Sequence, residues 1–283
     1  MSNASNVEII IPVYNALQEV QKCFESLRNS CNFEELALTF IDDHSESETR
    51  NWLQQLSTEF ANVVVIRNLR NRGFTKTVNR GLRQLTRKYV LILNSDTQIS
   101  KMAIEQLVNA VEISEKVAGA GPLSNAASWQ SVPMLFDENK QFKINALPKG
   151  KSLASYAQKI SELIDPKYPE VPLLNGFCML LRASSLAQVG LLDEKNFPKG
   201  YGEENDLCIR LIDEGFKLVI ADDCYVFHSK SASYGHKIRL KLSNLSGKKL
   251  VKKHGNVRMR AVVSELENNS RLNAVRALIS KIT

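Results

Sequence analysis

The feature that most constrains this chain is the alternation of short apolar runs with segments of helical periodicity through its first half. Runs rich in Val, Ile and Leu at residues 7–13, 36–43, 62–68 and 89–94 predict four buried strands. Each is followed by a stretch whose apolar residues recur at helical spacing, at residues 17–27, around 52–56, 76–86 and 102–115. Parallel strands need crossover connections of this kind, so the pattern predicts an α/β fold with a Rossmann-like, mostly parallel sheet flanked by helices.

The second half of the chain is less regular. Between residues 122 and 172, Gly, Pro, Ser and Asn are frequent, which predicts a long loop region with one helix near residues 153–163. Long ordered loops usually carry function. Further elements are predicted in the order strand 178–183, a short helix through Leu186, a helix at 204–214, and strands 217–221 and 225–228.

Length and cysteine content narrow the class of protein. A chain of 283 residues can bury a core without disulfide or metal staples. Its five cysteines are scattered and lack CxxC spacing, which argues against a disulfide framework or a structural zinc site. The apolar runs are strand-sized, and residues 1–6 are too short and polar for a signal peptide. We therefore expect a cytoplasmic protein.

The net charge of +7 is concentrated at one end of the chain. Residues 236–283 hold twelve Lys or Arg and two acids, a balance of +10, whereas residues 1–235 have a balance of −3. We expect two parts, an α/β catalytic domain at 1–235 and a basic helical C-terminal extension at 236–283.

Polar side chains follow all four predicted strands of the first half. Asn15 comes after the first, Asp42 and Asp43 end the second, residues 68–73 follow the third and residues 94–96 follow the fourth. Because open α/β sheets bind ligands beyond the carboxyl ends of their strands, these positions are the candidate site.

Asp42 and Asp43 have two interpretations. A carboxylate here can accept hydrogen bonds from a nucleoside base or a ribose. Asp and Ser in "DDHSES" are equally favoured as caps at the start of a helix. The residues themselves leave both interpretations open.

The tripeptide Asn94-Ser95-Asp96 offers a carboxylate that could hold Mg²⁺, which takes one or two protein carboxylates together with substrate phosphates. A turn with an Asp cap is the alternative. His228 ends the last predicted strand, and a lone His is more often structural than a ligand. Its value as a ligand depends on whether Asp96 lies nearby.

The segment "GYGEENDLCIRL" combines glycines with a cluster of acids. A helix starting near Glu203 places Glu203, Asp206 and Arg210 on one face. The acids could simply favour the helix dipole and form one surface ion pair. The functional interpretation is a general base at Glu204 or Glu203, placed at a cleft by the preceding glycines.

Several enzyme classes lack their motifs here. There is no GxxxxGK[ST], and no GxGxxG follows the first strand, which argues against P-loop nucleotidases and dinucleotide oxidoreductases. GxSxG and HExxH are absent as well.

Seven motifs in order resemble the family 2 glycosyltransferases, which have the GT-A fold. They span residues 7–235, and the resemblance is closest to bacterial rhamnosyltransferase-like members that build cell-surface polysaccharide. The motifs are "IIIPVYN", "IDDHS", "NRGFTKTVNRGL", "LNSDT", "LNGFCMLLR", "GYGEENDLCIR" and "HSKSASYG".

The resemblance implies a nucleotide site in the first half of the chain. One of the two acids at 42 and 43 would hold the base, and the loop after the third strand would close on the nucleotide sugar. The nucleotide-binding residues implied are Pro12, Tyr14, Asn15, Asp42, Asp43, Arg72, Gly73, Asn79 and Ser95.

The resemblance also implies the remaining roles. Asp96 matches the last acid of the family's DxD motif, which binds the Mg²⁺ or Mn²⁺ bridging the diphosphate, and His228 matches a histidine that can join it. Glu204 matches the catalytic base, with Glu203 as the alternative. The acceptor-side loop would contain Asn175 and Gly176.

Two residues depart from the family pattern. Asn94 stands where the first acid of DxD is expected, which puts the strength of metal binding in question. Glu204 stands in place of the usual Asp, so the site must accommodate a longer side chain.

The implied reaction is metal-dependent, inverting transfer of a sugar from a UDP- or dTDP-linked donor to a hydroxyl of a saccharide or lipid-linked acceptor. A sugar-nucleotide nucleotidylyltransferase is one alternative, but "PVYNALQEV" lacks the glycine-rich basic loop expected after its first strand. A non-catalytic protein that binds nucleotide sugars is the other.

The basic extension allows three interpretations. Leu240, Leu245, Leu250 and Val251 alternate with lysines, as in amphipathic helices that lie on a membrane leaflet. The extension could instead pack on the catalytic domain or in a homodimer. Nucleic acid is not expected as a partner, because few aromatic residues accompany the charges.

Overall fold

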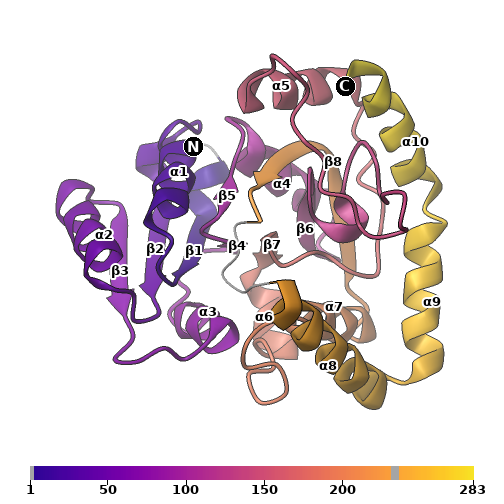
Figure 1. Ribbon diagram of the computed structural model, residues 1–283. Helices are drawn as coiled ribbons and strands as arrows, with labels where there is room; N and C mark the ends of the chain where they lie inside the picture. The colour runs from indigo at the N-terminus through magenta and orange to yellow at the C-terminus, as the bar shows by residue number, and fades with distance from the viewer. Residues whose placement is uncertain (1–2, 231–235) are drawn as a thin grey trace.

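The computed structural model of the chain describes residues 3–230 and 236–283. Its centre is an eight-stranded sheet with strand order β3-β2-β1-β4-β7-β6-β8-β5. The predicted α/β class is confirmed, with helices on both sides of the sheet (Figure 1). The strands are β1 (Val7–Val13), β2 (Ala37–Asp42), β3 (Val63–Arg67), β4 (Tyr89–Leu93), β5 (Thr97–Gln98), β6 (Val117–Ser124), β7 (Cys178–Arg182) and β8 (Lys217–His228).

The N-terminal half of the sheet is the predicted βαβ array. The pairs β1–β2, β2–β3 and β1–β4 are all parallel, and helices connect them. The C-terminal half is mixed, since β7 runs antiparallel to both β4 and β6. The helices of the domain are α1 (Leu17–Arg28), α2 (Ser47–Glu59), α3 (Phe74–Leu82), α4 (Ala103–Glu112), α5 (Leu153–Leu163), α6 (Ala183–Val189) and α7 (Glu203–Asp213).

Each face of the sheet buries its own apolar layer. Alternate residues of β1 face opposite sides, so Ile9 and Ile11 belong to the apolar cluster that contains residues of α1, α2 and α4, whereas Ile10 belongs to the cluster that contains residues of α3 and α7. A parallel strand covered on both faces reads as a continuous apolar run, which is why these strands are readable from the sequence.

The prediction of a loop from residue 122 onwards is wrong at its start. Residues 117–124 form the buried strand β6, although "VAGAGPLS" has few β-branched residues. The glycines are there for close packing: an added Cβ would lie 2.8 Å from Leu181 Cδ2 at Gly119 and 2.7 Å from Gln130 Nε2 at Gly121. The predicted helix α5 is confirmed, and a 3-10 turn, η3 (Ser128–Gln130), lies between them.

The two strands predicted at 217–221 and 225–228 are one strand, β8. Its register against β6 shifts between Pro122 and Leu123, which leaves residues 222–224 as a bulge. The bulge places the fully buried Asp222 against the backbone N–H groups of Lys167 and Tyr168, at 3.0 and 3.1 Å.

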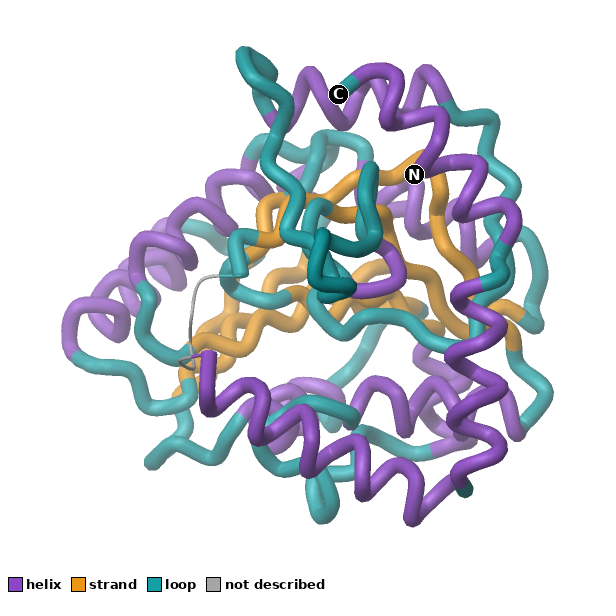
Figure 2. Tube along the Cα trace, turned by 45° about the vertical axis from the view of Figure 1, so that its right-hand side comes forward, coloured by secondary structure: helices purple, strands orange, loops and turns teal. Residues whose placement is uncertain are grey.

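The basic extension is helical, as predicted, and packs against the domain. Figure 1 shows α9 and α10 along one side of the molecule and α8 beneath α7, and the tube in Figure 2 shows the same course. Val262, Leu266, Leu272, Val275 and Ile279 join the apolar cluster on one face of the sheet. The three helices are α8 (His236–His254), α9 (Asn256–Glu267) and α10 (Ser270–Ile279).

Two predictions reach residues that are not described. The last motif, "HSKSASYG", runs into residues 231–235, and Leu240 of the predicted amphipathic pattern lies outside the residues whose side chains are described. Within the described residues, none of the helices is both long enough and apolar enough to cross a membrane.

Candidate active site

The carboxyl ends of β1, β2 and β3 meet at one edge of the sheet, where short hydrogen bonds tie their loops together. Asp43 N donates to Val13 O at 2.7 Å, and Asn68 N donates to Asp42 O at 2.8 Å. Asn15, in the left-handed region with φ 56°, accepts a hydrogen bond from Glu46 N at 2.8 Å through its side chain. The predicted candidates Pro12, Tyr14 and Asn15 therefore lie at this edge, and Tyr14 is about half exposed.

Asp43 organises the loop after β3. Its carboxylate accepts hydrogen bonds from Arg72 N at 2.7 Å, Gly73 N at 2.9 Å and Asn68 Nδ2 at 2.8 Å. The side chain is 4% exposed. The carboxylate thus holds residues 68–73 in place, and its contact with a nucleoside base stays a prediction.

Asp42 is bound as a local structural residue as well. It accepts a hydrogen bond from Ser45 N at 2.7 Å and forms an ion pair with the Arg67 guanidinium. The residue is 1% exposed. The helix-cap interpretation is wrong for Asp42, because the N-cap of α2 is Glu46, no side chain caps that helix, and Ser45 lies before it. A role in nucleotide binding stays a prediction for Asp42 too.

Asn79 binds another segment of the protein. Its Nδ2 donates to Leu192 O at 2.8 Å and to Glu194 Oε2 at 3.1 Å, and its Oδ1 accepts from Leu192 N at 3.1 Å. The side chain is buried, so these contacts give Asn79 a structural role. Gly73 packs against the same segment, because a Cβ there would lie 2.6 Å from Pro198 O.

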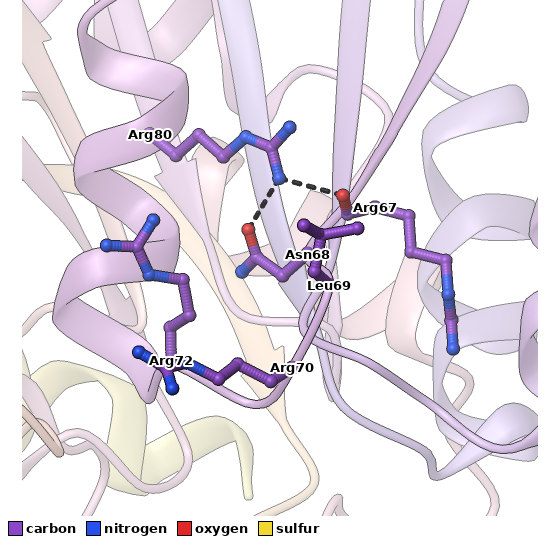
Figure 3. Close-up of a pocket in the computed structure, with 6 residues that line it drawn as sticks. All are labelled: Arg67, Asn68, Leu69, Arg70, Arg72 and Arg80. Atoms are coloured by element: carbon purple, nitrogen blue, oxygen red, sulfur yellow. Dashed lines mark hydrogen bonds between the residues drawn. The ribbon is translucent and has the colours of Figure 1, made fainter.

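Arginines gather beside this loop. Figure 3 shows Arg70 and Arg72 on the loop after β3, with Arg80 reaching from α3 toward Arg67 O and Asn68 Oδ1, at 2.8 and 2.6 Å. They line a cavity of about 920 Å³. The cavity lies next to the loop that the sequence assigns to the nucleotide, and its charge favours an anionic ligand.

Asp96 and His228 come together although they are far apart in the sequence. The cause is the antiparallel pairing of β5 with the end of β8, which sets Thr97 opposite His228. His228 Nε2 lies 3.3 Å from Asp96 Oδ1. Because Asp96 lies near His228, the histidine stays a candidate metal ligand.

The ring of His228 is held so that Nε2 faces Asp96. Its Nδ1 lies 3.0 Å from Ala126 O, and a carbonyl can only accept, so Nδ1 carries the proton. The ring also stacks on Phe177, with centroids 4.8 Å apart. A backbone carbonyl on the second ring nitrogen is the usual arrangement around a metal-ligating histidine.

Asn94 and Ser95 complete this end of β4. Asn94 Oδ1 is buried without a hydrogen-bond partner, which is costly unless a ligand satisfies it. Ser95 is partly buried between Asn94 and Asp96. Within the described residues, no group of three or more His, Cys, Asp or Glu could hold a metal ion. One carboxylate, one imidazole and an orphaned amide oxygen fit a divalent cation whose remaining ligands come from phosphates.

Glu203 and Glu204 form a coupled pair at the start of α7. Burial and the neighbouring Glu204 raise the pKa of Glu203 well above its usual range, and burial also raises the pKa of Glu204. Two buried carboxylates side by side repel each other, which favours the protonated form of one of them. Glu203 is 4% exposed, so it is the neutral partner and Glu204 the ionised one.

The segment 175–177 lies between this pair and the Asp96–His228 pair. At Gly176 an added Cβ would lie 3.2 Å from Glu204 Cβ, so the glycine lets the base approach. The next residue, Phe177, stacks on His228. Asn175 is fixed by Gln130, whose Oε1 accepts from Asn175 N at 2.6 Å.

A further set of contacts near α7 was predicted only in part, because the sequence placed Asp206 and Arg210 on one helix face and indicated no other partner. Asp206, fully buried, binds Arg210 at 2.9 Å, as predicted, and also Lys253 at 2.6 Å and His254 at 2.7 Å. Hydrogen bonds from Lys253, His254 and Arg210, together with the charge of Arg210, hold the pKa of Asp206 below its usual value despite burial. The extension thereby holds the helix that carries Glu203 and Glu204.

Residues 8–190 match the protein family described as Glycosyl transferase family 2. N-acetylglucosaminyl-diphospho-decaprenol L-rhamnosyltransferase of Mycobacterium tuberculosis H37Rv is 28% identical over 194 residues, which cover 62% of each chain. Dolichol-phosphate mannosyltransferase of Pyrococcus furiosus is 26% identical over 40% of this chain and 32% of that relative. The chain thus spans less than two thirds of the length of these relatives.

Solved structures of glycosyltransferases share the fold. The mannosyltransferase PcManGT from Pyrobaculum calidifontis, in complex with GDP-Man and Mn²⁺, superposes with a TM-score of 0.64 over 98% of this chain and 74% of that one, at 13% identity. GalNAc-T7 with UDP, GalNAc and Mn²⁺ superposes with a TM-score of 0.61 over 81% of this chain and 44% of that one, at 16% identity. These likenesses confirm the predicted GT-A fold.

Proposed function

The chain belongs to glycosyl transferase family 2, and from this premise we propose that it transfers a sugar from a nucleoside-diphosphate donor to a hydroxyl of a saccharide or lipid-linked acceptor. One observation carries the proposal. Residues 176 and 177 contact Glu204 on one side and His228 on the other, so a base and a pair that could hold a cation lie around one short segment. Transfer from a nucleoside diphosphate needs both kinds of group.

Glu204 is the proposed base. It accepts the proton of the acceptor hydroxyl as the oxygen attacks the anomeric carbon, and a single displacement of this kind inverts the anomeric configuration. The raised pKa of Glu204 makes its carboxylate a stronger base for removing the proton of the acceptor hydroxyl. Gly202 N donates a hydrogen bond to Glu204 Oε2 at 3.0 Å and so fixes the position of the base.

Asp96 and His228 Nε2 are the groups that would hold Mg²⁺ or Mn²⁺. Asn94, whose Oδ1 has no hydrogen-bond partner, precedes Asp96 by two residues in the chain. The cation would supply charge neutralisation for the departing nucleoside diphosphate. The Pyrobaculum neighbour was solved with a nucleotide sugar and Mn²⁺, which supports this assignment. The chain's own contribution is to hold the imidazole in one tautomer through Ala126 O.

The donor side is proposed at the edge formed by β1, β2 and β3, with Tyr14, Asn15 and Arg72 beside the nucleotide. UDP- and dTDP-linked sugars are the proposed donors. The Mycobacterium relative is named for a decaprenol-linked acceptor, which supports a lipid-linked acceptor, surface polysaccharide synthesis and work at the cytoplasmic face of a membrane.

The first experiment is calorimetric titration of UDP, dTDP and GDP into the protein with Mn²⁺, repeated with EDTA. We expect one nucleotide to bind and its affinity to fall on chelation. Binding of none of them, with or without metal, would contradict the proposal.

The second experiment compares Glu204→Gln with Glu214→Gln, an exposed residue at the end of the same helix. We expect Glu204→Gln to lower kcat by about 10²- to 10⁴-fold, the usual contribution of a general base, while nucleotide affinity is kept. Glu214→Gln should match the wild type. If the wild type binds nucleotide and shows no more turnover than Glu204→Gln, the protein is a non-catalytic binder.

A further inference from the structure

A short hairpin between β6 and α5 takes no part in the proposed chemistry. Phe136 and Phe142 form an antiparallel bridge, and two backbone hydrogen bonds flank it. Lys143 N donates to Leu135 O at 3.0 Å, and Asp137 N donates to Gln141 O at 2.9 Å. We call residues 133–145 the hairpin.

One face of the hairpin is entirely apolar. Residues directly opposite each other in this register, together with the alternation of side chains along a strand, put Met134, Phe136, Phe142 and Ile144 on the same face. The two phenylalanine rings lie 5.2 Å apart, and both pack on Trp129, at 5.9 and 5.0 Å.

This apolar face is largely uncovered. Met134 is 49% exposed, Phe142 37% and Ile144 57%. Single exposed apolar residues need no explanation, but three neighbours on an aromatic base form a patch of the kind that marks an interaction surface.

The hairpin is fixed to the strand that carries His228. Asn145 Nδ2 donates to Met134 O at 2.8 Å and to Asn125 O at 3.2 Å. Asn125 in turn donates to His228 O at 3.0 Å and accepts from His228 N at 2.7 Å. A surface bound to the hairpin is therefore held close to the proposed metal pair and to Asn175.

The charges around the apolar face are mainly positive. Residues 134–151 contain four lysines, at 140, 143, 149 and 151, and two acids, Asp137 and Glu138. Asp137 turns onto its own loop, where it accepts from Asn139 N and Gln141 N at 2.9 Å. Lys143 projects from the opposite face, and its Nζ lies 3.1 Å from Met134 Sδ, so its ammonium group reaches the edge of the apolar face.

Several basic residues of the extension are, by contrast, already paired within the protein. Arg258 binds Asp213 at 2.6 Å, Arg271 binds Asp222 at 2.7 Å, and Lys253 binds both Asp193 and Asp206. The extension therefore has fewer positive charges for binding an anionic surface than its composition indicates.

We propose that the hairpin is a membrane contact: its apolar face enters the interfacial region of an anionic bilayer, and its lysines bind lipid headgroups. An apolar face with Lys143 at its edge and further lysines in and after the hairpin fits this occupant, because it offers both apolar side chains for burial and positive charge for anionic headgroups. The purpose of this contact, which is to present a lipid-linked acceptor to Glu204, rests on the proposed function. The contact itself does not depend on that function. Vesicle binding is measured without donor, acceptor or metal, so its failure and the failure of the transferase assignment are distinct results.

The test is co-sedimentation of the full chain with vesicles of phosphatidylglycerol and phosphatidylcholine, compared with phosphatidylcholine alone. We expect binding to the anionic vesicles. Met134→Glu with Ile144→Glu should weaken it by roughly tenfold or more for each side chain withdrawn from the bilayer. Ile113→Glu is the matched control, since Ile113 is 53% exposed on α4 and should leave binding unchanged.

A spectroscopic readout locates the contact. The chain has two tryptophans, so Trp52→Phe leaves Trp129, which packs against the hairpin, as the only tryptophan whose fluorescence is followed. We expect brominated lipids to quench it. Unquenched fluorescence on vesicles that bind the protein would overturn the proposal, as would binding that is lost on Lys248→Glu with Lys252→Glu in α8 and kept in the hairpin variant.

Gel filtration tests the other possible occupant of the apolar face, a second copy of this chain. If the wild type is a dimer, the hairpin variant a monomer, and neither binds vesicles, a second copy of this chain covers the face and the proposal is wrong. Circular dichroism of each variant shows that a loss of binding is not a loss of fold.

Discussion

Replacing Gly176 by Ala tests whether the base is positioned by its contact with residues 175–177. An added Cβ would lie 3.2 Å from Glu204 Cβ, 3.5 Å from Cγ and 3.8 Å from Cδ. Ordinary contacts between such atoms begin near 3.4 Å, so Glu204 must move by a few tenths of an ångström. Since a misplacement of about 1 Å costs roughly 10²-fold in rate, we expect kcat to fall by about three- to tenfold.

The assay is steady-state turnover with the donor that calorimetry identifies, together with nucleotide affinity and a thermal melt. The affinity should stay within about twofold, because the shift is on the acceptor side of the site. Gly247→Ala is the matched control, since no atom lies within 4 Å of its added Cβ and its rate should not change. An unchanged kcat in Gly176→Ala, with the added methyl group confirmed by structure, would refute the proposed placement of the base.

Three further variants test the pH dependence, the packing of the extension and the metal pair. Because the pKa of Glu203 is raised in the folded state, its contribution to stability is present at low pH and is lost as pH rises, so the Tm of Glu203→Gln should increase relative to the wild type between about pH 5 and 8. Arg271→Met should lower the free energy of unfolding by about 1–3 kcal/mol in urea, because it leaves the buried Asp222 with backbone donors alone. His228→Ala should reduce Mn²⁺-dependent nucleotide affinity by about tenfold or more in calorimetry, with no change in EDTA.

The parts of the fold that could be predicted are those where local pattern and tertiary environment agree. β1 and β4 are buried on both faces, so their sequences are apolar runs, interrupted in β1 only by Glu8, with helices between the strands. β6 escaped prediction because its packing against Leu181 and Gln130 demands glycine, a residue that by itself indicates a turn. The bulge that joins the two halves of β8 depends on contacts with distant residues, which no local pattern reports.

The candidate site also has a part that the sequence predicted and a part that it could not predict. The resemblance named Asp96 and His228, and the pairing of β5 with β8 explains why two residues so far apart in sequence meet at 3.3 Å. Asn79 was assigned to the nucleotide from the motif "NRGFTKTVNRGL", and in the structure its side chain binds Leu192. A motif fixes where a residue lies along the chain, whereas the direction of its side chain depends on segments that the motif does not contain.

The extension shows why net charge alone is a poor guide to a partner. Its basicity indicated an anionic surface, yet Lys253 and His254 are directed inward to Asp206, three residues after Glu203 on the first turns of α7. Buried acids on the domain need cations, because an unpaired carboxylate in the interior is costly. The excess of acids in residues 1–235 and the excess of bases in residues 236–283 are therefore partly one feature, the contact between the two parts. It follows that deleting the extension would remove the ion pairs that hold the base helix, so a truncated chain would lose turnover for reasons unrelated to any membrane.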